Sequence, residues 1–147
     1  MAPRISEQIL EAAPWQQLQP LLDACFPLPP QDVFERVVAA SHRRQRLWTA
    51  AREGGELLGM VKLCPHSKGG HLDNLAVAPQ ARGQGVGHAL VKRLLADTAI
   101  EKPAMVSLTT RIPQFCAPMG FQSCGQLADG STAMMVLLSK VPSSTSN

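Results

Sequence analysis

The chain has 147 residues and a mass of 15.8 kDa, enough for one domain with a buried core. Hydrophobic residues make up 45% of it and charged residues 17%, which excludes a disordered chain, and no apolar stretch approaches the ~20 residues needed to cross a bilayer. A net charge of +3 suits an anionic small ligand and is too small to indicate nucleic-acid binding.

The cysteines and the N-terminal residues bear on the compartment. Cys25, Cys64, Cys116 and Cys124 form no C-x-x-C pair and have no histidine at ligand spacing, which indicates reduced thiols rather than a zinc site or a disulfide framework. Residues 1–14 lack the continuous hydrophobic segment of a secretory signal. We therefore expect a cytoplasmic protein with no metal and no membrane contact.

The first third of the chain predicts a strand and two helices. Residues 4–10 are typical of a strand, and a helix is expected to begin at Pro14, with Leu18 and the leucines at 21 and 22 on one face. Pro20 should kink or interrupt this helix. Residues 31–41 carry apolar residues at helical spacing and predict a second helix.

The middle of the chain changes to the spacing of strands. Residues 46–65 form two apolar runs around Glu53-Gly54-Gly55-Glu56, which predicts a hairpin. A turn at HSKGG (residues 66–70) should lead into the strand HLDNLAVAP, which Pro79 ends.

The last part of the chain predicts alternating helices and strands. A helix is expected over 85–98, where apolar residues repeat every three to four positions, then a strand over 104–109 and a short helix, interrupted by proline, over 112–119. A final strand is expected over 132–138. The order predicts one α/β domain over 1–140 with a mixed central sheet, and a disordered tail over 141–147.

The stretch QARGQGVGHAL (residues 80–90) joins a predicted strand to the best predicted helix and contains glycines at 83, 85 and 87. The first N–H groups of a helix lack internal partners, and the helix dipole places partial positive charge there. Glycines let a phosphate approach the backbone, and Arg82 adds a forked donor. The stretch therefore predicts an anion site.

Two common phosphate loops do not fit this stretch. A P-loop needs Lys and then Ser or Thr after its last glycine, where this chain has His88 and Ala89. The dinucleotide fingerprint needs glycine at 88 or 90, which are His88 and Leu90. The pattern R-x-x-G-x-G, formed by Arg82, Gly85 and Gly87, remains.

This pattern, within LAVAPQARGQGVGHALVKRLL, resembles the acetyl-coenzyme A binding motif of the GNAT superfamily of N-acetyltransferases. Downstream, FCAPMGF (residues 115–121) resembles the family segment F-Y-x-x-x-G-F. The resemblance implies a GNAT-like single domain, with a mostly antiparallel sheet flanked by about four helices. It also implies acetyl-CoA as cosubstrate and a small amine as acceptor, and it is compatible with a homodimer.

The resemblance assigns the coenzyme site residue by residue. The strand backbone at Leu75, Ala76 and Val77 would pair with the pantetheine arm, as an added strand does. The loop and the start of the following helix would hold the pyrophosphate, through Arg82, Gly83, Gln84, Gly85, Val86, Gly87 and His88.

Transfer to an amine calls for a base, and the resemblance places the family's glutamate position on His71. Asp73 lies on the same strand face and either orients the imidazole or acts as the base itself. His71 as a surface residue at a hairpin end is the alternative. The family tyrosine that protonates the leaving thiolate falls on Cys116, and the chain has no tyrosine. Cys116 is either a proton donor or a small core residue.

The stretch LTTRIPQFCAPMGF (residues 108–121) resembles the acetyltransferase domain of N-acetylglutamate synthases. This implies that Arg111 binds a carboxylate of an amino-acid acceptor. The predicted function is N-acetyl transfer by direct attack, to a small molecule such as an amino acid, a peptide N-terminus or a lysine. The alternative is a GNAT-like module that binds acyl-CoA as a sensor and does not catalyse.

Overall fold

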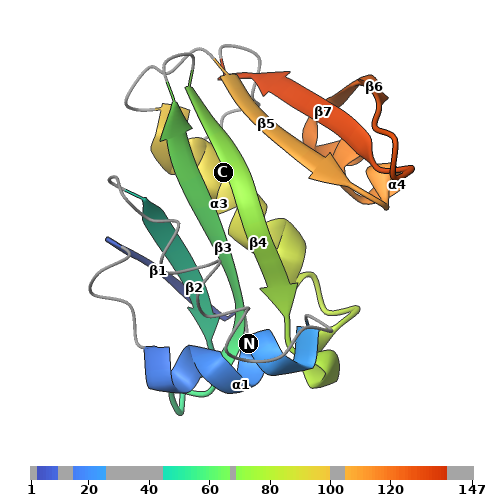
Figure 1. The fold of residues 1–147 in the computed structure, drawn as a ribbon. Helices are drawn as coiled ribbons and strands as arrows, with labels where there is room; N and C mark the ends of the chain where they lie inside the picture. The colour runs from blue at the N-terminus through green and yellow to red at the C-terminus, as the bar shows by residue number, and fades with distance from the viewer. Residues whose placement is uncertain (1–2, 10–14, 26–44, 67–68, 100–104, 139–147) are drawn as a thin grey trace.

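The computed structural model describes residues 3–9, 15–25, 45–66, 69–99 and 105–138, which are organised around one sheet (Figure 1). The sheet has seven strands in the order β1-β2-β3-β4-β5-β7-β6, and only β4 and β5 run parallel to each other. The strands are β1 (Arg4–Ile9), β2 (Arg46–Ala51), β3 (Leu57–His66), β4 (Gly69–Val77), β5 (Met105–Thr110), β6 (Gln122–Gln126) and β7 (Thr132–Leu137). This confirms the predicted α/β domain with a mixed, mostly antiparallel sheet.

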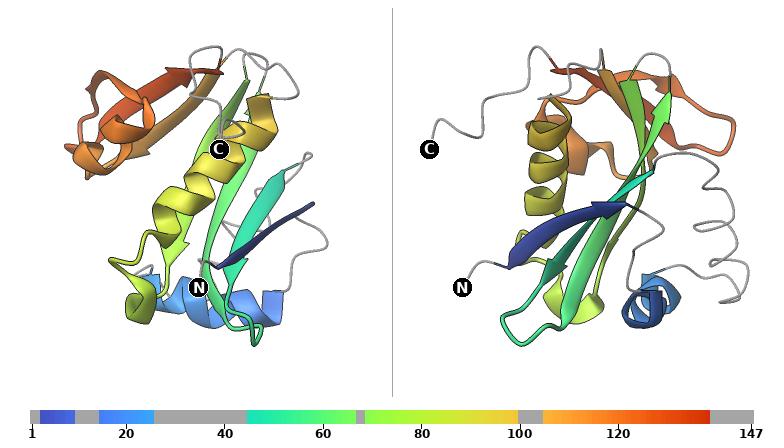
Figure 2. Two further views of the ribbon diagram at one scale, coloured as in Figure 1. Left: turned by 180° about the vertical axis from the view of Figure 1, so that it is seen from behind. Right: turned by 90° about the vertical axis from the view of Figure 1, so that its left-hand side faces the viewer.

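Helices cover both faces of the sheet. The two longer ones, α1 and α3, lie on opposite faces, as the right-hand view of Figure 2 shows. None of the described helices is long and apolar enough to span a membrane. The helical elements are α1 (Trp15–Cys25), the 3-10 turn η3 (Pro79–Ala81), α3 (Val86–Ala99), α4 (Pro113–Cys116) and the 3-10 turn η4 (Ala117–Met119).

The packing of α3 against the sheet confirms the apolar stripe expected from the sequence. The buried residues of this helix face β2, β3 and β4 and include Val86, Leu90, Val91, Leu94 and Leu95. Gly59 on β3 permits the close approach, since a Cβ there would lie 2.8 Å from the Ala76 carbonyl oxygen and 3.0 Å from a methyl of Leu90.

The predicted hairpin is confirmed as β2 and β3, which are antiparallel with a register shift between Ala50 and Ala51. The Arg52 N–H donates to the Glu56 carbonyl at 2.8 Å, and Gly55 has a φ of +94°, which favours glycine. The turn therefore forms where the Glu-Gly-Gly-Glu sequence predicted it.

The two parallel strands separate soon after they meet. Three residue pairs join β4 and β5: Gly69 with Met105, Gly70 with Val106, and His71 with Ser107. Beyond His71 the strands diverge, and Figure 1 shows the space between them widening toward the C-terminal end of β4. The backbone of β4 from Leu72 onward therefore has no strand partner on this side within the described residues.

Two local predictions were wrong and one strand was missed. The helix α1 runs through Pro20, so the proline does not interrupt it. Gly69 and Gly70 belong to β4 and not to the preceding turn, because a Cβ on Gly69 would overlap the Met105 carbonyl of the neighbouring strand. The edge strand β6 was not predicted, since all five of its residues are exposed and carry no apolar alternation.

Other predicted elements lie near the observed ones or outside the described residues. The strands predicted over 104–109 and 132–138 and the short helix over 112–119 correspond to β5, β7 and the pair α4–η4. The predicted helix over 31–41 and the predicted tail over 141–147 lie outside the described residues.

Candidate functional site

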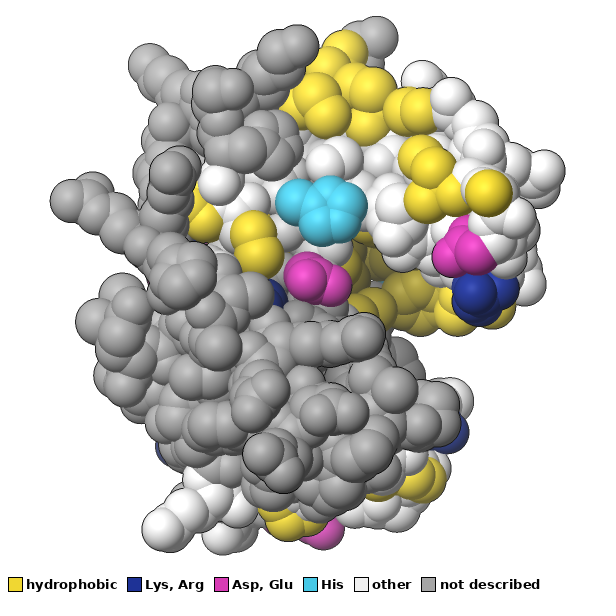
Figure 3. Space-filling view, in the orientation of Figure 1, with side chains coloured by type: hydrophobic (Ala, Val, Ile, Leu, Met, Phe, Trp, Pro, Cys, Tyr) yellow, Lys and Arg dark blue, Asp and Glu magenta, His cyan; other side chains and the backbone are white. Residues whose placement is uncertain are grey.

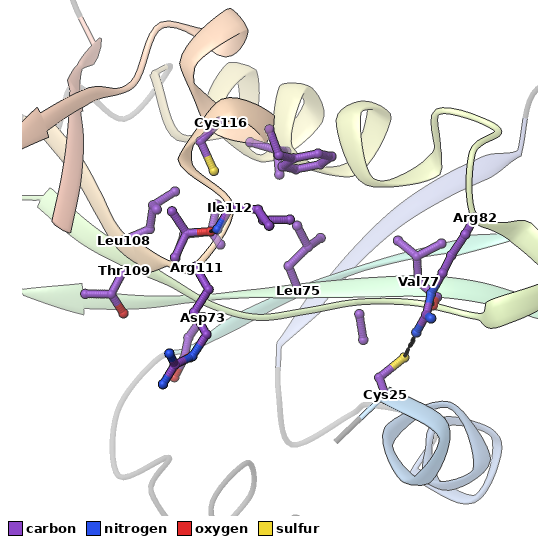
Figure 4. Close-up of a pocket in the computed structure, with 15 residues that line it drawn as sticks. Cys25, Asp73, Leu75, Val77, Arg82, Leu108, Thr109, Arg111, Ile112 and Cys116 are labelled. Atoms are coloured by element: carbon purple, nitrogen blue, oxygen red, sulfur yellow. Dashed lines mark hydrogen bonds between the residues drawn. The ribbon is translucent and has the colours of Figure 1, made fainter. Parts of the chain in front are cut away.

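A cavity of about 480 Å³ fills the space where β4 and β5 diverge, and Figure 4 shows its lining residues. The space-filling view shows the corresponding hollow in this face of the molecule (Figure 3). Five elements and the two loops that follow β4 and β5 contribute: β4, β5, α1, α3 and α4. The lining residues are Cys25, Leu72, Asp73, Leu75, Ala76, Val77, Arg82, Val91, Leu108, Thr109, Thr110, Arg111, Ile112, Phe115 and Cys116.

The loop between β4 and α3 presents bare backbone amides; its Arg82 lines this cavity, and Gln84, Gly85 and Val86 line a second one. Gly83 and Gly85 have φ of +79° and +81°, and a Cβ on either would meet nothing within 4 Å, so the loop faces open space. Ala89 makes the first helical bond, donating to the Gly85 carbonyl at 3.0 Å. Within the part of the chain that the structure describes, the N–H groups of residues 83–88 have no acceptor. Unpaired N–H groups and the dipole at the start of a helix both favour an anion, and the anion site expected from the sequence stays a prediction.

The third glycine of the loop has a different role from the other two. A Cβ on Gly87 would lie 3.0 Å from Phe115 Cζ and 3.5 Å from Val77 Cγ2. The ring of His88 meets the same phenylalanine edge to face, with 4.6 Å between ring centroids. Gly87 therefore lets α4 pack on the first turn of α3, which the interpretation of all three glycines as a phosphate cradle missed.

The side chain of Arg82 turns back toward the end of β4. Its Nε donates to the Val77 carbonyl at 3.2 Å and its Nη2 lies 3.7 Å from Cys25 Sγ. The Cys25 thiol also donates to the Val77 carbonyl, at 3.3 Å, and Figure 4 shows the thiol and the guanidinium meeting. Arg82 thus joins α1 to β4 beside the anion site, and sequence reasoning gave no role to Cys25.

His71 lies at the last pair of residues that joins β4 to β5. Its Nδ1 is 3.0 Å from Ser107 Oγ on the neighbouring strand, so Nε2 is the ring nitrogen left for proton transfer. His71 is half-buried and is not among the described residues that line the cavity, whereas Asp73, two positions on, lines it. Ser107, which the sequence reasoning did not consider, thus contacts the imidazole, and the predicted role of Asp73 stays a prediction.

Cys116 lines the inner part of the cavity and exposes 5% of its surface. Burial raises the pKa of its thiol above the ordinary value of 9.0, and a hydrogen bond with the Thr110 side chain opposes this in part. The thiol is therefore neutral at physiological pH and holds a proton at the cavity wall.

This thiol yields a prediction for alkaline stability. Because the pKa of Cys116 in the folded chain lies above 9.0, the unfolded chain loses the thiol proton first. Its contribution to stability is complete below about pH 9 and is lost as pH rises through the folded-state pKa. The free energy of unfolding should fall there by up to ~1.4 kcal/mol per pH unit for each such thiol.

Urea unfolding at several pH values from about 8 to 10.5 measures this slope. Cys64, whose pKa burial also raises, adds a second contribution. Cys116→Ala should therefore reduce the slope and not abolish it. Cys124→Ala, at an exposed position on β6, is the matched control. An equal slope in the two variants contradicts the assignment to Cys116.

Arg111 lies at the outer rim of the cavity with its side chain 71% exposed. It already has a partner: its Nη1 donates to the Asp129 carbonyl at 3.1 Å, and its Nη2 lies 3.5 Å from a carboxylate oxygen of the same residue. Asp129 comes from the turn between β6 and β7. A carboxylate ligand would share Arg111 with this aspartate, and the predicted role in acceptor binding stays a prediction.

Comparison with known proteins relates this arrangement to one family. Residues 15–117 match the sequence profile of the acetyltransferase (GNAT) family. No curated protein sequence matches the chain.

Solved structures share the fold over nearly the whole chain. Aminoglycoside 6'-acetyltransferase type Ii has a TM-score of 0.79 at 23% identity, covering 95% of this chain and 99% of that one. A GNAT family N-acetyltransferase from Escherichia coli in complex with CoA has a TM-score of 0.77 at 18% identity, covering 94% and 82%. The ribosomal-protein-S18-alanine N-acetyltransferase from Escherichia coli has a TM-score of 0.75 at 16% identity, covering 96% and 98%. At these identities the likeness establishes the fold.

Proposed function

The chain belongs to the GNAT acetyltransferase family, and from this premise we propose that it moves an acetyl group from acetyl-CoA to a primary amine by direct attack. The observation that carries the proposal is the opening of β4 away from β5 beside a loop of bare amides. A long thin ligand with a phosphate group at one end fits this combination.

The two parts of the site suit the two parts of the carrier. The amides of residues 83–88 and the dipole of α3 would hold the pyrophosphate. The pantetheine arm would lie along β4 in the wedge-shaped space between β4 and β5, pairing with the backbone of Leu75 and Val77 as an added strand. The Val77 carbonyl is already an acceptor for Arg82 and Cys25, so its N–H is the group left for the arm. The relative solved in complex with CoA supports CoA as the ligand.

The chemistry needs a neutral amine and a protonated leaving group. His71, through Nε2 and a water, would take a proton from the ammonium, and Ser107 would hold the ring. The amine nitrogen then bonds to the thioester carbon, the C–S bond breaks and the thiolate leaves, and the nitrogen gives up its second proton to solvent as the amide forms. Cys116, neutral and at the cavity wall, would donate a proton to that thiolate and regain one from solvent. Asp73 lines the cavity and is the candidate that attracts the ammonium.

The acceptor is a small amine that reaches Asp73 from the open rim. Arg111 at the same rim would bind the carboxylate of an amino-acid acceptor, in competition with Asp129. The names of the structural relatives include an aminoglycoside and a protein N-terminal alanine as acceptors, so the fold alone does not select one.

Release of free CoA thiol from acetyl-CoA tests the proposal, with a panel of glutamate and other amino acids, polyamines, an aminoglycoside and peptide N-termini. We expect release above background with at least one amine. Acetyl-CoA binding without release for any acceptor would favour a non-catalytic acyl-CoA sensor, which the lack of tyrosine at position 116 would then explain.

A further inference from the structure

We infer that this cavity takes acyl groups longer than acetyl, and that a straight chain of butyryl size fits its inner end. The inference rests on the proposed function, because it concerns the acyl end of the same carrier. The observation behind this inference is that the cavity has a polar rim and an apolar inner end.

The rim of the cavity is polar and its inner end is apolar. Exposed side chains at the rim include Asp73, Arg82, Thr109 and Arg111. The inner lining residues are almost fully buried, yet they border the cavity, so the cavity penetrates the core. Their exposed fractions are Leu72 7%, Val91 1%, Leu108 4% and Cys116 5%.

The inner end offers little to a polar group. Its side chains are hydrocarbon except for the Cys116 thiol, which Figure 4 shows pointing into the cavity from α4. The hydrogen bond between that thiol and Thr110 already occupies it in part. Water in such a space lacks the two to four polar partners that hold a buried water, whereas methylene groups gain from burial.

The geometry of the wedge places the acyl group at this inner end. From Val77 to Leu72 the strand advances about 16 Å, at ~3.3 Å per residue. The pantetheine arm, with roughly thirteen bonds at about 1.2 Å of advance each, is of similar length. In the proposed function the pyrophosphate lies on the loop beyond Val77. The sulfur of CoA then reaches the level of Asp73 or Leu72, in the space between β4 and β5. The acyl carbons then meet Leu72 and Leu108, which directly follow the last paired residues of β4 and β5.

The depth of the inner end of the cavity limits the length of the acyl group. The strands pair again at His71 and Ser107, one position behind Leu72 and Leu108. One residue of strand, about 3.3 Å, accommodates two to three bonds of an extended chain. This is the difference between acetyl and butyryl, and a much longer chain would meet the paired strands.

Calorimetric titration of the full chain with acetyl-CoA, butyryl-CoA and octanoyl-CoA tests the inference without requiring turnover. Each buried methylene should tighten binding about fourfold, so butyryl-CoA, with two more methylenes, should bind roughly 15-fold more tightly than acetyl-CoA. Octanoyl-CoA should bind no more tightly than butyryl-CoA. Butyryl-CoA binding equal to or weaker than acetyl-CoA overturns the inference and leaves the proposed function intact. If none of the three binds, the proposed function itself fails.

A pair of matched variants locates the effect. Val91→Ile adds one methylene to the inner lining and should reduce the preference for butyryl-CoA over acetyl-CoA at least fivefold. Val136→Ile makes the same change at a residue of β7 that is also buried and lines no described cavity, and it should keep the preference of the parent chain. Equal preferences in the two variants would place the acyl group elsewhere and overturn the inference.

Discussion

Gly85→Val should raise the dissociation constant of acetyl-CoA at least 100-fold, which corresponds to about 2.7 kcal/mol. Gly85 stands in the middle of the bare amides, and a Cβ there points into open space that the pyrophosphate would occupy. A valine would therefore hold the phosphate away from the N–H groups. Equilibrium titration with acetyl-CoA measures the loss.

The variant also strains the backbone, so it needs a control. Gly85 has a φ of +81°, a region that β-branched residues avoid. Gly130, in the turn between β6 and β7, has a φ of +89° and equally open surroundings. Gly130→Val should lose a similar amount of thermal stability and keep its affinity for acetyl-CoA. Equal affinities in the two variants would contradict the anion site.

His71→Ala should lower kcat about 100-fold or more and change the affinity for acetyl-CoA less than twofold. General base catalysis contributes factors of this size, and His71 lies outside the lining of the cavity that would hold the arm. Steady-state kinetics with the best acceptor, together with titration of acetyl-CoA, separate the two effects.

Ser107→Ala is a second, milder test of His71 as the base. It removes the group 3.0 Å from Nδ1 and leaves the imidazole in place, so kcat should fall by a smaller factor, about tenfold. Full activity in His71→Ala would remove this residue as the base, and Asp73→Asn would then test the other candidate.

Sequence patterns predicted the parts of the fold that local forces determine. The stripe on α3 and the Gly54-Gly55 hairpin need only helical spacing and turn chemistry. The strand β6 has no apolar alternation, because its residues face solvent on both sides, and so no pattern marks it. Gly69 and Gly70 look like a turn in the sequence and lie in β4 because a neighbouring strand passes close to them.

In the candidate site, too, the local features could be predicted and the contacts between distant residues could not. The loop at residues 82–88 could be predicted, because its glycines and the following helix are contiguous in the chain. The contacts of His71 with Ser107, of Arg82 with Cys25 and of Gly87 with Phe115 join residues 28 to 57 positions apart. Such contacts depend on strand order and helix packing, which a single sequence does not reveal.

The three residue pairs that join β4 to β5 divide the sheet into two units with a narrow seam. On one side, β2, β3 and β4 pack against α3 and, in the proposed function, lead to the phosphate end of the site; on the other, β5 and the loop after it supply Thr109 and Arg111 of the rim. Substitutions in one unit alter few contacts of the other, so under the proposed function the residues that meet the acceptor can change while those that meet the nucleotide are preserved. A bound acetyl-CoA would contact both units and so hold them together where only three residue pairs join them.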